Sequence, residues 1–215
     1  VCAGAILIVL PAGMSRSAWM AAVVACGWVY WTERIGWEKT KAVCRRYKNA
    51  TIPFIAIVAI LVGCTIAGVY GMKQDSADGR LLMWKVTGKA IAGQPLAGTG
   101  LGGFPAAYAE AQGGYFATGN ATDREKRVAG CPEYAFNEYL QIGLEQGGGG
   151  LIVFVAWLGS MAYYGIRNRQ QGAAGGVLAL AVFAVSSYPL QLPSFWVALV
   201  FLGAICVTED GTRTR

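Results

Sequence analysis

The chain has 215 residues, of which 55% are hydrophobic and only 14% are charged, whereas about a quarter of the residues in a soluble domain are charged. It carries six more basic than acidic residues, and it contains no histidine, the commonest general base and metal ligand. These figures exclude an ordinary soluble enzyme and disfavour a zinc site, and they indicate a membrane protein.

Six apolar blocks predict an all-α integral membrane protein with about six membrane-spanning helical segments. A bilayer core needs about 20 residues per helix, and the block 52–70 runs for 19 residues without a charge. The other blocks, several of them shorter, are Val1–Gly13, Ala18–Trp31, Gly147–Ile166, Gly175–Tyr188 and Phe195–Val207. Because the chain begins at valine inside an apolar block, we interpret it as a fragment that lacks upstream spans.

The placement of lysine and arginine predicts the orientation of these spans. The loop 32–48 holds six basic and two acidic residues, and further basic residues follow Ile166 and end the chain. Placing all three regions in the cytoplasm gives a strict alternation of spans. The predicted organisation is therefore a first membrane region (1–70), an extracytoplasmic segment (71–146), the last spans (147–208) and a cytoplasmic tail (209–215).

The predicted extracytoplasmic segment 71–146 holds seven basic and eight acidic residues. This near-neutral balance argues against nucleic acid as a partner, because nucleic-acid binding needs a clustered basic face. The segment contains one cysteine, Cys131, so no internal disulfide is expected within it.

Amphipathic helices are expected in this segment. After a cap at Ser76 or Asp78, a helix beginning near Gly79 would place Leu81, Trp84, Gly88 and Ile91 on one face and Lys85 and Lys89 on another. Such a helix suits the membrane interface, although a surface helix packed on the spans fits the same pattern.

The next stretch, "GTGLGGF", matches G-x-G-x-x-G at Gly98, Gly100 and Gly103 but lacks the strand and βαβ context of a dinucleotide site. We interpret it as a tight turn in which Gly100 and Gly102 let backbone N–H groups approach a ligand such as phosphate, with a purely structural turn as the alternative.

A charged loop at 120–130, expected to be mobile and solvated, precedes a polar stripe. A helix beginning at Pro132 would place Asn137, Gln141 and Glu145 on one face, with Glu138 and Tyr139 beside it, at the outer entrance of the span 147–166. Polar side chains at such a place favour a wet cavity, and solvation of a helix end is the alternative.

Two arginines belong to the same predicted side of the membrane. Arg16 lies between two apolar blocks in "GMSRSAW", and Arg80 follows the block 52–70 in "DGRLLMW". Either arginine alone fits snorkelling to lipid phosphate. Together with the glycine turn and the polar stripe they predict a site for a lipid-linked phosphate, which arginine binds through two parallel hydrogen bonds.

These features, in this order, resemble the bacterial O-antigen ligase and O-antigen polymerase superfamily. The similar segments are "SRSAW", "GRLLMWK", "QPLAGTGLGGF" with Tyr108 soon after, "FNEYLQIGLEQGGGGLIVF" and "YPLQLPSFW", and they match the later part of a family member.

The resemblance implies an inverting glycosyltransferase in the bacterial inner membrane, with its site facing the periplasm. It would move a glycan from undecaprenyl diphosphate to a hydroxyl of the lipid A core, of another repeat unit or of a protein, and it would use no nucleotide sugar and no metal or other cofactor. Arg16 and Arg80 would hold the donor diphosphate.

The sequence departs from the family at Phe136. At this position, immediately before the asparagine of the motif, family members commonly have a histidine that acts on the acceptor. The nearest substitute base is Glu138, with Asn137, Tyr139, Gln141 and Glu145 expected to contact the sugars. Two alternatives also fit this departure. The glycan transfer step needs little help from a base, or the protein is inactive.

The principal hypothesis is ligation of O-antigen to the lipid A core. The alternatives are an O-antigen polymerase, a polysaccharide transporter or flippase, and a non-catalytic membrane scaffold. Charged residues in mid-span would favour transport, and the predicted spans contain none.

Overall fold

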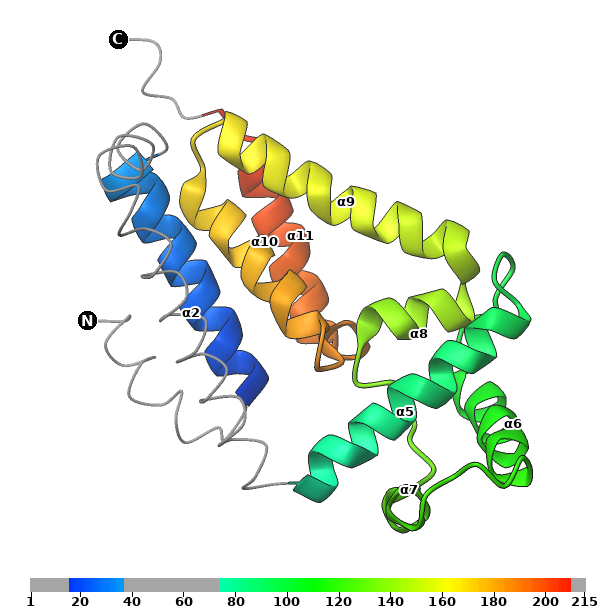
Figure 1. Cartoon of the computed structure of the whole chain (residues 1–215). Helices are drawn as coiled ribbons and strands as arrows, with labels where there is room; N and C mark the ends of the chain where they lie inside the picture. The colour runs from blue at the N-terminus through cyan, green and yellow to red at the C-terminus, as the bar shows by residue number, and fades with distance from the viewer. Residues whose placement is uncertain (1–15, 37–73, 210–215) are drawn as a thin grey trace, which may run out of the picture.

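The described part of the computed structural model comprises residues 16–36 and 74–209, and within these ranges it contains helices and no strand. Four helices form a bundle: α2 (Arg16–Tyr30), α9 (Gly147–Arg167), α10 (Gln171–Ala184) and α11 (Pro193–Val207). Four more form a cap at one end of the bundle: α5 (Gln74–Gly93), α6 (Phe104–Ala117), α7 (Asp123–Val128) and α8 (Glu138–Glu145). We call residues 74–146 the cap (Figure 1).

The bundle helices coincide with four of the six predicted spans, and the blocks Val1–Gly13 and Ile52–Tyr70 lie outside the described residues. Among the described helices, α9 is long and apolar enough to cross a membrane, whereas α10 and α11 are apolar but shorter. Helix α10 begins and ends four residues earlier than predicted, because Val185–Tyr188 leave the helix to join a loop that closes the bundle.

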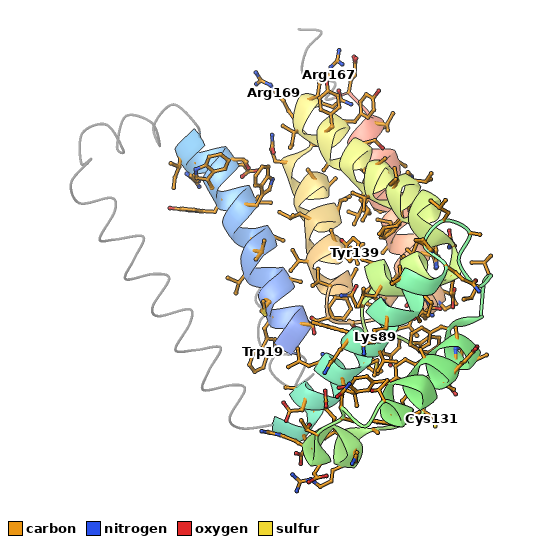
Figure 2. All side chains as sticks on the ribbon, turned by 45° about the vertical axis from the view of Figure 1, so that its right-hand side comes forward. Trp19, Lys89, Cys131, Tyr139, Arg167 and Arg169 are labelled. Atoms are coloured by element: carbon orange, nitrogen blue, oxygen red, sulfur yellow. The ribbon has the colours of Figure 1, made fainter. Side chains whose placement is uncertain are left out.

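Three of the four described bundle helices run in one direction and the fourth runs in the other. Helices α2, α9 and α11 end away from the cap, and α10 returns toward it (Figure 1). Arg167 and Arg169 lie at the end opposite Lys89 and Cys131 of the cap (Figure 2). This arrangement is the one that the predicted alternation of spans requires, while the side of the membrane stays a prediction.

Small residues let the bundle helices approach closely, which is the packing expected where lipid replaces water. Helix α10 packs along α2, and a Cβ added at Gly175 would lie 2.6 Å from Cγ2 of Val29. A short π-helical turn, Trp31–Ile35, ends α2.

Two separate apolar cores meet at α8. One lies within the cap and includes Leu82, Phe104 and Leu144, and the other lies within the bundle and includes Ile142 and Leu199. Because Ile142 and Leu144 both belong to α8, this short helix joins the cap to the bundle.

The cap differs from the sequence-based expectation in two helices. Helix α5 is already formed at Gln74, and the residues that it buries in the cap core are Leu82, Val86 and Thr87, while Leu81 is 53% exposed. The predicted apolar face was therefore wrong by about one residue, because α5 packs against α6, α7 and α8 and its inward face is set by those contacts.

The charged segment 120–130, predicted to be a mobile loop, contains α7. The Thr122 side chain accepts a hydrogen bond from the Glu125 backbone N–H, and the Glu125 carboxylate accepts one from the Thr122 N–H, which makes a reciprocal helix cap. Glu125 also pairs with Lys85 of α5 at 2.8 Å, so α7 is fastened to the cap.

Candidate functional site

Arg80 of α5 is held against the loop that joins α10 to α11. Its Nη1 donates a hydrogen bond of 2.9 Å to the carbonyl oxygen of Ser186. Its guanidinium carbon lies 5.1 Å from the centroid of the Phe136 ring, an arrangement that the ring quadrupole stabilises. The guanidinium is thus positioned where the cap meets the bundle.

The first turn of α2 reaches the same carbonyl. Ser17 Oγ donates to Ser186 O at 3.2 Å and accepts a hydrogen bond of 2.8 Å from Ser186 Oγ. Because consecutive Cα atoms are about 3.8 Å apart, the backbone of Arg16 lies at the same end of the bundle as Arg80. The side chain of Arg16 is outside the described residues, so convergence of the two guanidiniums stays a prediction.

Three aromatic rings gather beside Arg80, and we call them the aromatic cluster: Tyr134, Phe136 and Tyr188. The rings of Tyr134 and Tyr188 stack with centroids 5.2 Å apart, and the edge contact between Phe136 and Tyr188 measures 4.8 Å. Phe136 has a φ of +49°, a region in which a bulky side chain is strained. Such strain persists only where surrounding contacts fix it, and it is common at functional sites.

Neither tyrosine of this cluster had a role predicted from the sequence. Both lie in segments already noted for other reasons, Tyr134 just before the polar stripe and Tyr188 at the start of "YPLQLPSFW". An aromatic residue in each segment was the available signal, but nothing in the sequence showed that the two segments touch.

Glu138, predicted as the catalytic base, is 1% exposed and binds the loop between α10 and α11. Its carboxylate accepts hydrogen bonds from the Leu190 backbone N–H at 2.7 Å and from Gln191 Nε2 at 3.3 Å. Burial raises the pKa of Glu138 above its ordinary value of 4.5, and the nearby Glu145 adds to this, while the two hydrogen bonds oppose it. Through these hydrogen bonds the carboxylate links α8 to the loop.

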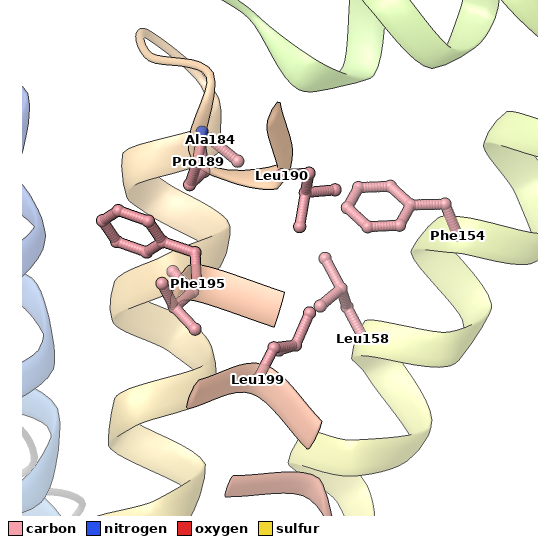
Figure 3. A pocket seen from close by; sticks show the side chains of 8 residues that line it. Phe154, Leu158, Ala184, Pro189, Leu190, Phe195 and Leu199 are labelled. Atoms are coloured by element: carbon pink, nitrogen blue, oxygen red, sulfur yellow. The ribbon is translucent and has the colours of Figure 1, made fainter. Parts of the chain in front are cut away.

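The loop between α10 and α11 is also held by apolar packing against the bundle. Its short 3₁₀ turn, Pro189–Gln191, covers a cavity of about 10 Å³ between α9, α10 and α11 (Figure 3). The Leu190 side chain points toward Phe154 of α9 across this cavity, which has room for about one water molecule. Leu190 thus fixes the loop twice, through its backbone to Glu138 and through its side chain to the bundle.

The polar stripe predicted to line an acceptor site has partners within the protein. Helix α8 begins at Glu138 and not at Pro132, because the Asn137 side chain caps it by accepting from the Leu140 N–H at 3.1 Å. Gln141 is buried, accepts from the Ala135 N–H at 2.9 Å and donates to Glu145 at 3.1 Å.

Tyr139 completes these internal contacts by donating a hydrogen bond of 2.9 Å to the Ala181 carbonyl of α10. The assignment of Asn137, Tyr139, Gln141 and Glu145 as sugar ligands stays a prediction. The contacts give all four a structural role at the junction of cap and bundle.

The glycine turn approaches the junction between α8 and α9. The N–H of Thr99 donates to Leu144 O at 2.8 Å, and the N–H of Gly100 donates to Glu145 O at 2.9 Å, so both cap the end of α8. Gly100 and Gly102 have φ of +91° and +74° and are exposed. These contacts favour the structural alternative for Gly100, and phosphate binding at this turn stays a prediction.

A second hollow, a cleft of about 280 Å³, lies between α5 and the segment around α7. Two ion pairs border it, Lys85 with Glu125 and Arg124 with Asp78. The lysine ammonium lowers the pKa of Glu125 to about 2, and the Thr122 backbone N–H adds to this. Within the described ranges, no group of three or more aspartate, glutamate or cysteine side chains is arranged to hold a metal ion.

A family model described as O-antigen ligase matches residues 1–155, which is more than half of the chain. No curated protein and no solved structure matches it. The matched residues include α2, α5, Phe136 and Glu138, and therefore most of the candidate site.

Proposed function

Because the chain belongs to the O-antigen ligase family, a family of membrane proteins that transfer glycans, we propose that it moves a glycan from undecaprenyl diphosphate to a hydroxyl of the lipid A core. The acceptor oxygen attacks the anomeric carbon and its proton passes to solvent water, the bond from that carbon to the diphosphate oxygen breaks, and undecaprenyl diphosphate leaves with both electrons of that bond. Attack opposite the leaving group inverts the anomeric configuration.

The observation that carries this proposal is the position of Arg80. Its guanidinium is fixed on Phe136 and on Ser186 O, where the first turn of α2 also arrives. A positioned arginine at the membrane boundary matches a lipid-linked diphosphate, because its planar group donates two parallel hydrogen bonds to phosphate oxygens. We assign Arg80, together with Arg16, to the donor diphosphate.

The aromatic cluster gives the donor sugar a surface beside the arginine. Tyr134 and Tyr188 present stacked rings next to Phe136. Aromatic faces combine a large apolar area with a polar hydroxyl tip, which suits a sugar ring with apolar and hydroxylated sides. We therefore assign the cluster to the sugar next to the diphosphate.

Glu138 is proposed as a positioning residue in place of the base predicted from the sequence. Its carboxylate is almost fully buried and accepts hydrogen bonds from Leu190 and Gln191, which hold the loop that carries Ser186 and Tyr188. The departing diphosphate, stabilised by arginine, then supplies most of the driving force, as expected for electrostatic stabilisation of a leaving group.

Deletion of the gene from its host tests the proposed function. Loss of a ligase leaves polymerised glycan on undecaprenyl diphosphate and lipopolysaccharide without O-antigen, and a plasmid copy of the gene restores both. Accumulation of single lipid-linked repeat units would instead identify a polymerase. Unchanged lipopolysaccharide and unchanged lipid-linked pools would refute both activities.

A further inference from the structure

The loop between α5 and α6, residues 94–103, exposes two leucines at the place where the α9 span begins. Leu96 is 83% exposed and Leu101 is 80% exposed, more than the other large apolar side chains of the described residues. A single exposed leucine needs no explanation. Two within one ten-residue loop, both almost fully exposed, call for a partner surface.

The loop is held rigidly at this position. Besides the hydrogen bonds of Thr99 and Gly100 to the end of α8, the Gly148 N–H donates to Pro95 O at 2.8 Å. Gly147 has a φ of +68°, and a Cβ there would lie 2.1 Å from Leu96 O. Leu96 is therefore fixed beside the first turn of α9, and the leucines are presented by an ordered backbone.

The level of this loop relative to a bilayer follows from the length of α9. Its 21 residues at about 1.5 Å per residue span about 30 Å, the thickness of a hydrocarbon core. The first turn of α9, and with it Leu96, then lies at the boundary between hydrocarbon and headgroups. The same helix exposes Ile152 and Val153, at 71% and 70%, as an apolar side toward lipid.

The charges of the cap are distributed in agreement with this level. No charged residue occurs between Lys89 and Glu110, although segment 71–146 holds fifteen charged residues in all, six of them up to Lys89 and nine from Glu110 onward. An interfacial segment that lacks charge and carries exposed leucines can enter the acyl region at little electrostatic cost.

We propose that residues 94–103 form a membrane anchor, in which Leu96 and Leu101 insert into the acyl boundary of the leaflet next to the cap. The anchor continues the lipid-facing side of α9. Because its backbone caps α8, insertion sets the depth of α8, and with it the depth of Asn137 and Glu138 beside the candidate site. The proposal does not depend on the reaction that the protein catalyses.

Spin-label accessibility of the full chain in nanodiscs of phosphatidylethanolamine and phosphatidylglycerol tests this anchor. A nitroxide is attached to Leu101→Cys after the six native cysteines are replaced by alanine. Ile152→Cys on α9 serves as the lipid-facing reference, and Asp123→Cys, whose native side chain is 97% exposed on α7, serves as the water-facing reference.

The anchor predicts that the label at residue 101 collides readily with oxygen and rarely with a water-soluble nickel chelate, as the label at residue 152 does. Ready collision with the chelate, as at residue 123, would place the loop in water and overturn the proposal. Rare collision with both reagents would show a protein contact and would also overturn it.

A second measurement keeps the native cysteines. A photoreactive benzoyl-phenylalanine at position 96, irradiated in native membranes, should give adducts with phospholipid that mass spectrometry detects. Adducts with protein alone, or no adducts while a probe at position 152 reacts with lipid, would contradict the anchor.

Discussion

Replacement of Glu138 by glutamine separates a positioning role from a catalytic one. The carboxylate accepts hydrogen bonds from Leu190 N–H and Gln191 Nε2. Glutamine keeps one acceptor oxygen for Leu190, and the Gln191 amide can turn over to accept from the new NH₂ group. The variant therefore loses the negative charge that strengthens these hydrogen bonds, but it also loses the penalty of burying a carboxylate. We expect a net cost of about 1 kcal/mol in the free energy that holds the loop against α8.

This cost predicts a modest loss of activity. About 1 kcal/mol corresponds to about a fivefold change in rate, whereas removal of a general base costs about 10²- to 10⁴-fold. The assay measures glycan transfer by purified protein in nanodiscs as a function of pH, for the native chain and for Glu138→Gln. A loss above a hundredfold, with disappearance of the acid limb of the rate profile, would refute the positioning role and identify Glu138 as the base.

Glu138→Gln should also change how the stability of the protein depends on pH. Because the folded pKa of Glu138 is raised above its ordinary 4.5, its favourable contribution to folding is complete below that pH and is lost as the pH rises through the folded pKa. Thermal unfolding of the native protein should therefore show this decrease, and Glu138→Gln should lack it. An identical pH dependence in the two proteins would contradict the burial that raises the pKa.

Three further predictions concern the parts that hold the site. Glu125, with a pKa lowered to about 2, contributes stability above pH 4.5 that is lost as the pH falls toward 2. Glu125→Gln should therefore flatten the acid side of the plot of unfolding temperature against pH. An unchanged plot would contradict the ion pair with Lys85. Gly147→Ala should destabilise the protein by several kcal/mol, because its Cβ would lie 2.1 Å from Leu96 O at a φ of +68°. The control Gly149→Ala, whose Cβ meets nothing within 4 Å, should be neutral or stabilising. Equal unfolding temperatures of the two variants would contradict the packing of the loop 94–103 against α9. Asn137→Ala should cost about 1 kcal/mol in unfolding free energy through loss of the α8 cap, and no change would show that this cap contributes nothing.

The sequence was sufficient to predict four apolar helices and the family, because apolar blocks and short motifs are local properties of the chain. The α9 span was predicted to within one residue of its observed end at Arg167. The face of α5 was predicted less well, because Leu81 and Leu82 are equally apolar and only packing against α6, α7 and α8 decides which one is buried.

The contacts of the predicted site residues could not be read from the sequence for a similar reason. Residue type identified Arg80 and Glu138, but their partners, Ser186 and Leu190, are 106 and 52 residues away along the chain. The predicted start of α8 was wrong because proline often opens a helix, whereas α8 begins after Pro132, at the Asn137 cap that follows the positive φ of Phe136.

The proposed donor site at Arg80 is tested most directly by Arg80→Lys, with Arg167→Lys at the far end of α9 as the matched control (Figure 2). The measurement is kcat/KM for a lipid-linked glycan donor in nanodiscs, on variants whose unfolding temperatures match the native protein. Loss of the planar fork should lower kcat/KM about ten- to a hundredfold in Arg80→Lys, the range expected for a hydrogen bond to a charged group, and leave Arg167→Lys unchanged. Native kcat/KM in both Arg80→Lys and Arg80→Ala would contradict a diphosphate site at this position.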